Sequence, residues 1–221
     1  MEFRAVLIDV YETALSCDFA AHAIELPALT DVDGEVWTET IQGLAPEVSD
    51  GRISMFDAYA EVLRRVGAPV PDGRVHELVK LDHQLLLANS RLYEDTVPFL
   101  EMLRRRGVLT AFVSNCAENT RPLLGHLGLI DLVDAVVLSC EVGAVKPDPV
   151  IYEHALRELD VAADTVVLID DQDAYCDGAT AVGIHAIRMC RSDGAVARHG
   201  RQTVASLADL ADLAWTAVTA N

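Results

Sequence analysis

The stretch AVLIDVYET, residues 5–13, sets an uninterrupted apolar run directly before an aspartate. A second stretch, VVLIDD at residues 166–171, repeats this arrangement near the other end of the chain. Short apolar runs that end in polar residues are typical of parallel strands, which are buried on both faces of a sheet. The two stretches therefore predict two buried strands, each followed by a carboxylate.

Further apolar runs of strand length alternate with segments whose apolar residues recur at helical spacing. The expected strands are 5–10, 109–113, 135–138, 166–169 and 184–187, and the expected core helices are 98–106, 120–127, 149–159 and 174–182. This alternation predicts an α/β fold, a Rossmann-like doubly wound parallel sheet. A last helix is expected over about 202–216, where apolar residues recur every three positions.

The segment 16–91 interrupts the alternation, because it has no convincing strand and shows helical patterns at 38–44, 54–66 and 74–89. We therefore expect an all-helical cap over 16–91, inserted into an α/β core formed by 1–15 and 92–221. Hinges are expected near Leu15 and Leu92. Ser54 is expected to cap the helix that follows it.

The composition is that of a globular protein, with 51% hydrophobic and 24% charged residues in 221. Lys and Arg total 17 against 35 Asp and Glu, which gives a formal net charge of −18. Such a charge opposes binding to nucleic acid or to an anionic membrane, so neither is an expected partner. It also repels anionic substrates, so phosphate chemistry would need a locally positive site or a bound cation.

The start of the chain lacks the pattern of a secretory signal, and no apolar stretch approaches the roughly 20 residues of a membrane-spanning helix. The five cysteines are odd in number and widely spaced, so neither a disulfide framework nor a zinc site is predicted. The seven histidines lack metal-ligand spacing, which favours surface or core roles. We expect a cytoplasmic protein, either a monomer or a homodimer.

Polar residues follow the predicted strands at the carboxyl ends, where doubly wound sheets bind their ligands. They are Asp9, Tyr11 and Thr13, then Ser114 and Asn115, then Lys146 in the run KPDP, and finally Asp170 and Asp171. A single strand-ending carboxylate is more often a structural cap than a catalytic group. Four such groups together bring a nucleophile, donors for an oxyanion, a cation and a carboxylate pair to one edge of the sheet.

The order Asp-x-Tyr-x-Thr, Ser-Asn, Lys-Pro-Asp-Pro and Asp-Asp resembles that of the haloacid dehalogenase superfamily of hydrolases, over essentially the whole chain. The resemblance implies that Asp9 is the nucleophile of a covalent aspartyl intermediate, that Thr13 and Ser114 hold the transferring group, and that Lys146 offsets its charge. It also implies a Mg²⁺ ion bound by Asp9, Asp171, the backbone carbonyl of Tyr11 and, as a further candidate, Asp170. Tyr11, Ser114 and Asn115 are the expected substrate contacts, with helix capping as the alternative role of Asn115.

Tyr11 departs from the pattern of the superfamily's phosphatases, which usually carry a second aspartate at this position as general acid and base. Such proton transfer is worth about 10²–10⁴-fold, so its absence predicts slow hydrolysis of ordinary phosphate esters. The superfamily's haloacid dehalogenases carry a Tyr there, because a halide leaves without a proton. Tyr11 therefore favours a 2-haloacid dehalogenase.

The pair Asp170 and Asp171 favours a metal-dependent phosphatase, because the metal-free dehalogenases resemble one another in lacking this pair. Three carboxylates against Lys146 alone would raise a carboxylate pKa unless a cation is bound. The dehalogenases also take an Arg from the start of the cap, whereas Thr38 follows Trp37 here. We favour Mg²⁺-dependent hydrolysis of a small phosphorylated molecule, with dehalogenation of a halogenated acid as the alternative.

A third hypothesis is a catalytically weak or inactive relative that binds a phosphorylated ligand or a protein. It is favoured by Tyr175 and Cys176, which stand where the superfamily often has Asn and Asp. Asp173 or Asp177 would then have to replace the missing acid. Substrate choice is expected to depend on the cap, whose facing residues the sequence does not identify.

Overall fold

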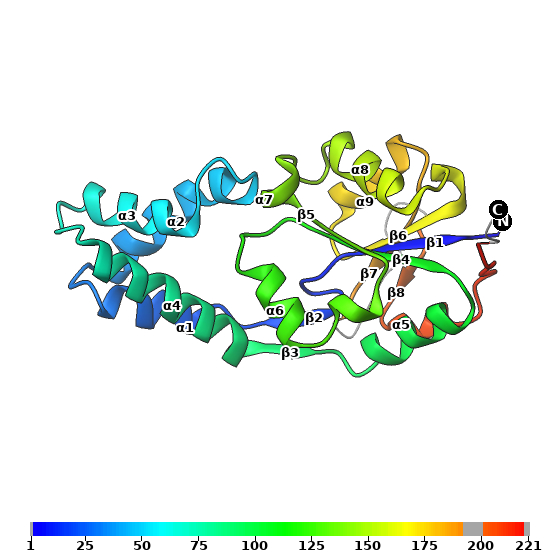
Figure 1. Cartoon of the computed structure of the whole chain (residues 1–221), viewed down its shortest axis with the longest axis horizontal. Coiled ribbons are helices and arrows are strands. Elements are labelled where there is room, and N and C mark those ends of the chain that lie inside the picture. Colours follow the sequence, from blue (N-terminus) through cyan, green and yellow to red (C-terminus); the bar gives the residue numbers. More distant parts are fainter. Residues whose placement is uncertain (1, 192–200, 219–221) are drawn as a thin grey trace.

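A computed structural model gives the fold of the chain and describes residues 2–191 and 201–218. Figure 1 shows two regions along the long axis, with the helices α1–α4 on the left and a sheet with its covering helices on the right. The chain enters the helical region after its first strand and returns from it before the rest of the sheet is formed.

Six parallel strands form the sheet, in the order β5-β4-β1-β6-β7-β8. Their bounds are β1 Ala5–Ile8, β4 Leu109–Ser114, β5 Ala135–Leu138, β6 Val166–Asp170, β7 His185–Met189 and β8 Thr203–Val204. The first strand lies at the centre, with Ile8 paired to Phe112 on one side and to Ile169 on the other. The predicted α/β fold with a parallel sheet is confirmed, and each strand predicted in it lies within two residues of its observed bounds.

Helices cover both faces of the sheet (Figure 1). Val6 and Ile8 pack toward α5 (Thr96–Arg105) and α6 (Thr120–His126), in one apolar cluster. Ala5 and Leu7 pack toward α8 (Pro149–Leu159) and α9 (Asp173–Ala181), in a second cluster. This alternation is the two-residue period of a strand that is buried on both faces. Four short elements complete this region: η1 Ile130–Leu132, α7 Ser139–Val142, η2 Ala163–Thr165 and η3 Leu207–Leu210.

The helical region has an apolar core of its own, which includes Trp37, Tyr59 and Leu78. Its helices are α1 Ala20–Ala28, α2 Gly34–Ser49, α3 Met55–Arg65 and α4 Asp72–Asn89. The predicted cap at Ser54 is confirmed, since Ser54 and Asp57 form a reciprocal capping box at the start of α3. The helix α1 was not among the predicted helices, and it begins without a side-chain cap.

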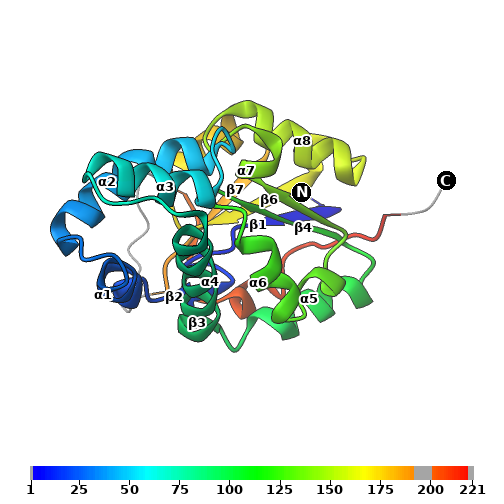
Figure 2. The ribbon, with the colours of Figure 1, turned by 60° about the vertical axis from the view of Figure 1, so that its left-hand side comes forward.

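Two short antiparallel strands connect the regions, β2 (Leu15–Cys17) and β3 (Ser90–Leu92), with Leu15 paired to Leu92. Figure 2 shows them at the base of α1 and α4. The expected hinges thus fall in a paired ribbon, so the chain leaves and returns at one place. The boundaries 16–91 for a cap and 1–15 with 92–221 for a core stay a prediction.

The helix predicted over 202–216 is wrong. The structure has β8 and the 3-10 helix η3 there, with Leu207 and Leu210 buried. A strict repeat of three residues is the period of a 3-10 helix, not of an α-helix. After a turn at 211–213, Trp215 forms a parallel β-bridge with Phe3, which donates a backbone hydrogen bond to Ala214 and accepts one from Thr216, each 2.8 Å long.

Among the described residues, no helix combines the length and the apolar character that crossing a bilayer requires.

Candidate active site

The ends of three adjacent strands bring predicted site residues together. Asp9 follows β1, Ser114 ends β4 and Asp170 ends β6. Because Ile8 is in register with Ile169, the next residues along the two strands, Asp9 and Asp170, lie side by side. Both carboxylates are buried.

Lys146 joins these two carboxylates from the segment between α7 and α8. Its Nζ donates to Oδ1 of Asp9 and to Oδ2 of Asp170, each at 2.6 Å, and its side chain is fully buried. The charge on the carboxylates raises the pKa of Lys146 against the effect of burial, so the amine stays protonated. Lys146 is therefore a fixed positive charge beside the predicted nucleophile.

One carboxylate oxygen each of Asp9, Asp170 and Asp171 lies within 4.8 Å of the others. Burial raises the pKa of Asp9 to about 7, and the charges of Asp170 and Asp171 add to this while Lys146 opposes it. Burial and Asp170 also raise the pKa of Asp171. Three converging carboxylates with one lysine leave an excess of negative charge, and oxygen ligands of this kind are those that Mg²⁺ prefers. The donor set fits Mg²⁺.

The hydroxyls of Thr13 and Ser114 are buried, and neither has a hydrogen-bond partner among the residues that the structure describes. Leaving a buried hydroxyl unpaired costs about 1–3 kcal/mol, so such groups usually have a partner. Both residues were predicted to hold the transferring group. Unpaired donors at this place fit the acceptor oxygens of an anionic ligand.

The side chain of Asn115 is engaged with the backbone of Lys146. Its Nδ2 donates to the carbonyl of Lys146 at 2.9 Å, and its Oδ1 accepts from the amide of Lys146 at 2.7 Å. This pair of bonds fixes the segment that carries the buried lysine. The structure therefore gives Asn115 a positioning role, and its contact with substrate stays a prediction.

Tyr11 points its hydroxyl at Thr120, with the two oxygens 2.9 Å apart. Burial raises the pKa of Tyr11 above its usual value. A phenol that holds its proton so firmly is a poor general acid near neutral pH, so Tyr11 does not replace the missing aspartate.

Asp173 and Asp177 do not reach the carboxylate cluster. Both pair with Arg201, and Asp173 also lies 3.6 Å from Arg188. Tyr175, by contrast, lies beside the site, with its ring centre 5.0 Å from Nζ of Lys146. Within the described ranges, the acids that converge are therefore Asp9, Asp170 and Asp171 alone.

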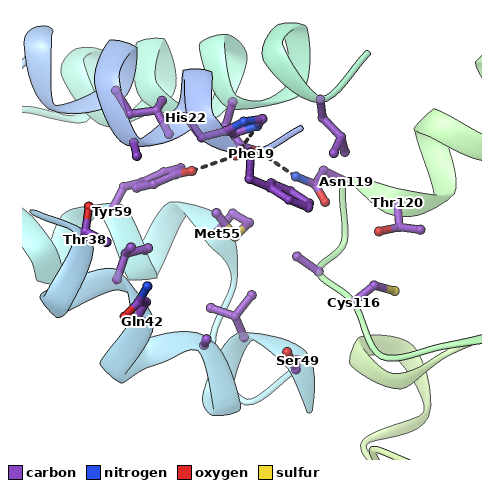
Figure 3. Close-up of a pocket in the computed structure, with 18 of the residues that line it drawn as sticks. Phe19, His22, Thr38, Gln42, Ser49, Met55, Tyr59, Cys116, Asn119 and Thr120 are labelled. Atoms are coloured by element: carbon purple, nitrogen blue, oxygen red, sulfur yellow. Dashed lines mark hydrogen bonds and ion pairs between the residues drawn. The ribbon is translucent and has the colours of Figure 1, made fainter. Parts of the chain in front are cut away.

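A cavity of about 570 Å³ lies between the helical region and the sheet edge. Figure 3 shows its lining, which comes from α1, α2, α3 and α4 on one side and from residues around Asn119 and Thr120 on the other. Tyr11 and Asn115 belong to this lining, so the cavity adjoins the predicted active site. The sequence did not locate it, because residues from several separate helices must meet to form it.

Comparisons with known proteins identify the family of this chain. A family model described as haloacid dehalogenase-like hydrolase matches residues 3–183. Phosphatase MT3486 of Mycobacterium tuberculosis is 36% identical over 118 residues, which are 52% of this chain and 53% of that protein, so the match spans about half of each. A glyceraldehyde 3-phosphate phosphatase of Methanopyrus kandleri is 31% identical over 199 residues, 85% of this chain and 84% of that protein. An (S)-2-haloacid dehalogenase of Pseudomonas is 26% identical over 196 residues, 85% of each chain.

Solved structures share the fold. A HAD phosphatase from Thermococcus onnurineus has a TM-score of 0.69 at 24% identity, over 95% of this chain and 96% of that one. The magnesium-bound HAD-hydrolase YfnB of Bacillus subtilis has a TM-score of 0.65 at 18% identity, over 97% and 99% of the two chains.

Proposed function

Since the chain belongs to the haloacid dehalogenase-like hydrolase family, we propose that it is a Mg²⁺-dependent phosphatase. Its substrate is a phosphate ester of a small molecule, and Asp9 forms the covalent intermediate. The observation that carries the proposal is the cluster of Asp9, Asp170 and Asp171 around the single amine of Lys146. A hydrolase that works without a metal has no use for two further carboxylates beside its nucleophile, because their charge raises the pKa of Asp9.

In the first step an oxygen of Asp9 attacks phosphorus, and the bond from phosphorus to the leaving oxygen breaks. Lys146 orients the carboxylate through its hydrogen bond to Oδ1 and offsets the charge of the incoming group. The free hydroxyls of Thr13 and Ser114 donate to phosphoryl oxygens. When bound by Asp9, Asp170, Asp171 and the carbonyl of Tyr11, Mg²⁺ supplies positive charge that keeps Asp9 ionised and polarises the phosphoryl group.

In the second step water attacks phosphorus of the aspartyl phosphate, which returns the Asp9 carboxylate and releases inorganic phosphate. No carboxyl group stands at position 11 to give the leaving oxygen a proton or to take one from water, so both protons are exchanged with solvent. The enzyme is therefore suited to esters whose leaving oxygen is stable as an anion.

Dehalogenation is the second candidate, and Tyr11 is the residue that favours it. In that reaction Asp9 would displace a halide from carbon, and water would hydrolyse the resulting ester. The relative named as a haloacid dehalogenase is consistent with this possibility. The excess of carboxylates at the site favours the phosphatase, because the dehalogenases resemble one another in lacking them.

A parallel assay of phosphate and chloride release tests the two candidates. We expect the wild-type protein to release phosphate from 4-nitrophenyl phosphate with Mg²⁺, to lose this activity with EDTA, and to release no chloride from 2-chloropropionate. Asp9→Asn is the control that should abolish turnover. Chloride release that is independent of Mg²⁺ would reverse the assignment, and Mg²⁺-dependent trapping of beryllofluoride without turnover of any ester would indicate a binding protein.

A further inference from the structure

The cavity beside Tyr11 holds a buried carboxylate that the proposed mechanism does not use. Asp82, on α4, accepts a 2.9 Å hydrogen bond at Oδ1 from the hydroxyl of Tyr59 on α3. Its Oδ2 accepts a 2.6 Å bond from Nδ2 of Asn119, which precedes α6. Figure 3 shows Tyr59, His22 and Asn119 converging on one point, marked by dashed lines. The cluster thus joins the helical region to the sheet edge.

His22, on α1, leaves this cluster incomplete. Its Nε2 lies 3.7 Å from Oδ1 of Asp82, which is beyond hydrogen-bond distance. Both ring nitrogens are buried, and within the described part of the chain neither has a hydrogen-bond partner. A buried imidazole whose nitrogens lack a partner, in a residue that lines the cavity, is a candidate for hydrogen bonding to a ligand.

Asp82 also has unused capacity for hydrogen bonds. A carboxylate offers about four lone-pair sites, and Tyr59 and Asn119 occupy two of them. Both partners are neutral. Asn119 carries an amide, and burial and the charge of Asp82 raise the pKa of Tyr59 well above its usual value. Among the described residues that line the cavity there is no lysine or arginine. Asp82 therefore has no lysine or arginine in the cavity wall to pair with, whereas Lys146 pairs with the catalytic carboxylates.

The rest of the wall is largely apolar, although Thr38, Gln42 and Ser49 of α2 also line it (Figure 3). Phe19, Trp37 and Met55 line the cavity, and the rings of Trp37 and Tyr59 stack with their centres 5.7 Å apart. A volume of about 570 Å³ lies within the range of about 300–1,000 Å³ that is typical of small-molecule sites. This space is large enough for a ring-sized organic group, and aromatic walls also favour a cation.

We propose that this cavity binds the leaving group of the substrate and selects one that joins an apolar, ring-sized body to a protonated amine. The amine donates to Asp82 and to an open nitrogen of His22, while the ring packs against Trp37 and Met55. The inference rests on the proposed phosphatase function, which places the phosphoryl group at Asp9, two residues before the cavity-lining Tyr11. It names the substrate class as phosphate monoesters of ring-bearing amino alcohols or of phenols that carry an aminoalkyl group.

Three aryl phosphates that differ in one substituent test this selection. They are 4-(aminomethyl)phenyl, 4-methylphenyl and 4-carboxyphenyl phosphate, assayed for phosphate release with Mg²⁺. A hydrogen bond to a charged group predicts a kcat/KM for the amine at least about tenfold above that for the methyl compound. The carboxylate compound should be the slowest of the three, because its charge is repelled by Asp82.

Asp82→Asn keeps the shape of the side chain and removes its charge. In this variant the preference for the amine over the methyl compound should fall about tenfold. The matched control is Glu39→Gln, which removes an exposed carboxylate from α2 outside the cavity. It should leave the preference unchanged.

Binding of the alcohol products is a second measurement, which requires neither turnover nor a variant that folds. Calorimetry on the wild-type protein should give a Kd for 4-hydroxybenzylamine that is at least about tenfold lower than the Kd for 4-methylphenol. Equal rates for the amine and methyl esters, or equal binding of the two phenols, would overturn the inference and leave the phosphatase proposal intact. If no ester releases phosphate, the phosphatase proposal fails, and the calorimetry alone decides whether the cavity selects amines.

Discussion

Nζ of Lys146 lies 2.6 Å from Oδ1 of Asp9, with both side chains buried at the edge of the sheet. This contact joins the end of the central strand to a segment 137 residues further along the chain. It fixes the oxygen atoms of the proposed nucleophile before any substrate arrives. Because the lysine serves two carboxylates, its removal affects stability as well as chemistry.

Lys146→Met should lower both activity and stability. Removing one partner of a buried ion pair costs about 3–5 kcal/mol, because the charges left behind are unpaired. Thermal unfolding without metal should show this loss, and Mg²⁺ should restore part of it by compensating the carboxylates. Lys80→Met, at an exposed position on α4, is the control. An unchanged melting temperature for Lys146→Met would contradict the network described for Asp9.

Thr13→Val and Ser114→Ala should separate activity from stability. Each change removes a buried hydroxyl that has no partner among the described residues, so stability should stay the same or rise by about 1 kcal/mol. Phosphate release should fall about 10–100-fold, because a donor to the phosphoryl group is lost. Thr30→Val removes a buried hydroxyl that donates to the Pro27 carbonyl at 2.8 Å, so it should lose stability and keep activity. Loss of stability in the first two variants would show that their hydroxyls serve the fold.

The sequence predicted the sheet and the carboxylate cluster because both depend on local patterns. A buried parallel strand must be apolar throughout, and the residue after it must lie at the sheet edge, so AVLID and VVLIDD locate Asp9 and Asp170 together. The role of Asn115 was not predictable, since its bonds to the backbone of Lys146 join positions 31 residues apart. The helix α1 was missed because it has no side-chain cap and contains Pro27.

Asp82 did leave a signal in the sequence that the prediction did not use. It stands on the buried stripe of α4, between Leu78 and Leu85, where an amphipathic helix ordinarily has an apolar residue. A carboxylate at such a position must find partners, and the pattern alone predicts a buried polar contact. Its partners, Tyr59 and Asn119, come from other parts of the chain, so only the structure identifies them.

Binding of Mg²⁺ should strengthen as the pH rises from 6 to 8. The pKa of Asp9 in the metal-free protein is about 7, raised by burial and by Asp170 and Asp171 against the effect of Lys146. The ionised fraction therefore goes from roughly 10% to roughly 90%, and metal binds the ionised form, so the Kd should fall about tenfold. Calorimetry at the two pH values, with proton release measured in two buffers, checks this. Equal Kd values without proton release would contradict it.

The raised pKa of Asp9 also determines how the stability of the metal-free protein changes with pH. The pKa of Asp9 is higher in the folded than in the unfolded state, so the folded state binds the proton more firmly. The contribution of this proton to the free energy of unfolding is lost as the pH rises from about 4 through about 7. Without metal, stability should therefore fall over this range by the share that Asp9 contributes. The gain in melting temperature on adding Mg²⁺ should be larger at pH 8 than at pH 6. Asp9→Asn should remove this difference.

Gly178→Ala should disturb the segment that carries Lys146. A Cβ at this position of α9 would lie 2.6 Å from Cβ of Pro147 and 2.8 Å from its carbonyl oxygen, so the backbone after Lys146 must shift. We expect a loss of about 1–3 kcal/mol and a clear fall in kcat. Gly43→Ala, on α2, meets no atom within 4 Å and should stabilise the protein by about 0.5–1 kcal/mol with activity unchanged. Wild-type activity in Gly178→Ala would show that the lysine tolerates movement of its segment.

Tyr11→Asp should restore a proton donor at the position where the superfamily's phosphatases carry one. If the proposed function is right, wild-type activity depends steeply on the pKa of the leaving group, because no residue protonates the departing oxygen. The variant should therefore gain at least about tenfold on alkyl phosphates and much less on 4-nitrophenyl phosphate, which needs no proton. Steady-state kinetics on both ester types measure this difference.

Tyr11→Phe is the matched control, since it removes the bond to Thr120 but adds no carboxyl group. It should leave the dependence on the leaving group as steep as in the wild type. Both variants must be shown to fold by their melting curves, because Tyr11 is largely buried beside Phe19. A folded Tyr11→Asp variant that gains nothing on any ester, and that loses a halide release present in the wild type, would assign Tyr11 to a dehalogenase site. The carboxylates of Asp170 and Asp171 would then have to serve the fold, and replacing Asp171 with Asn should leave halide release intact.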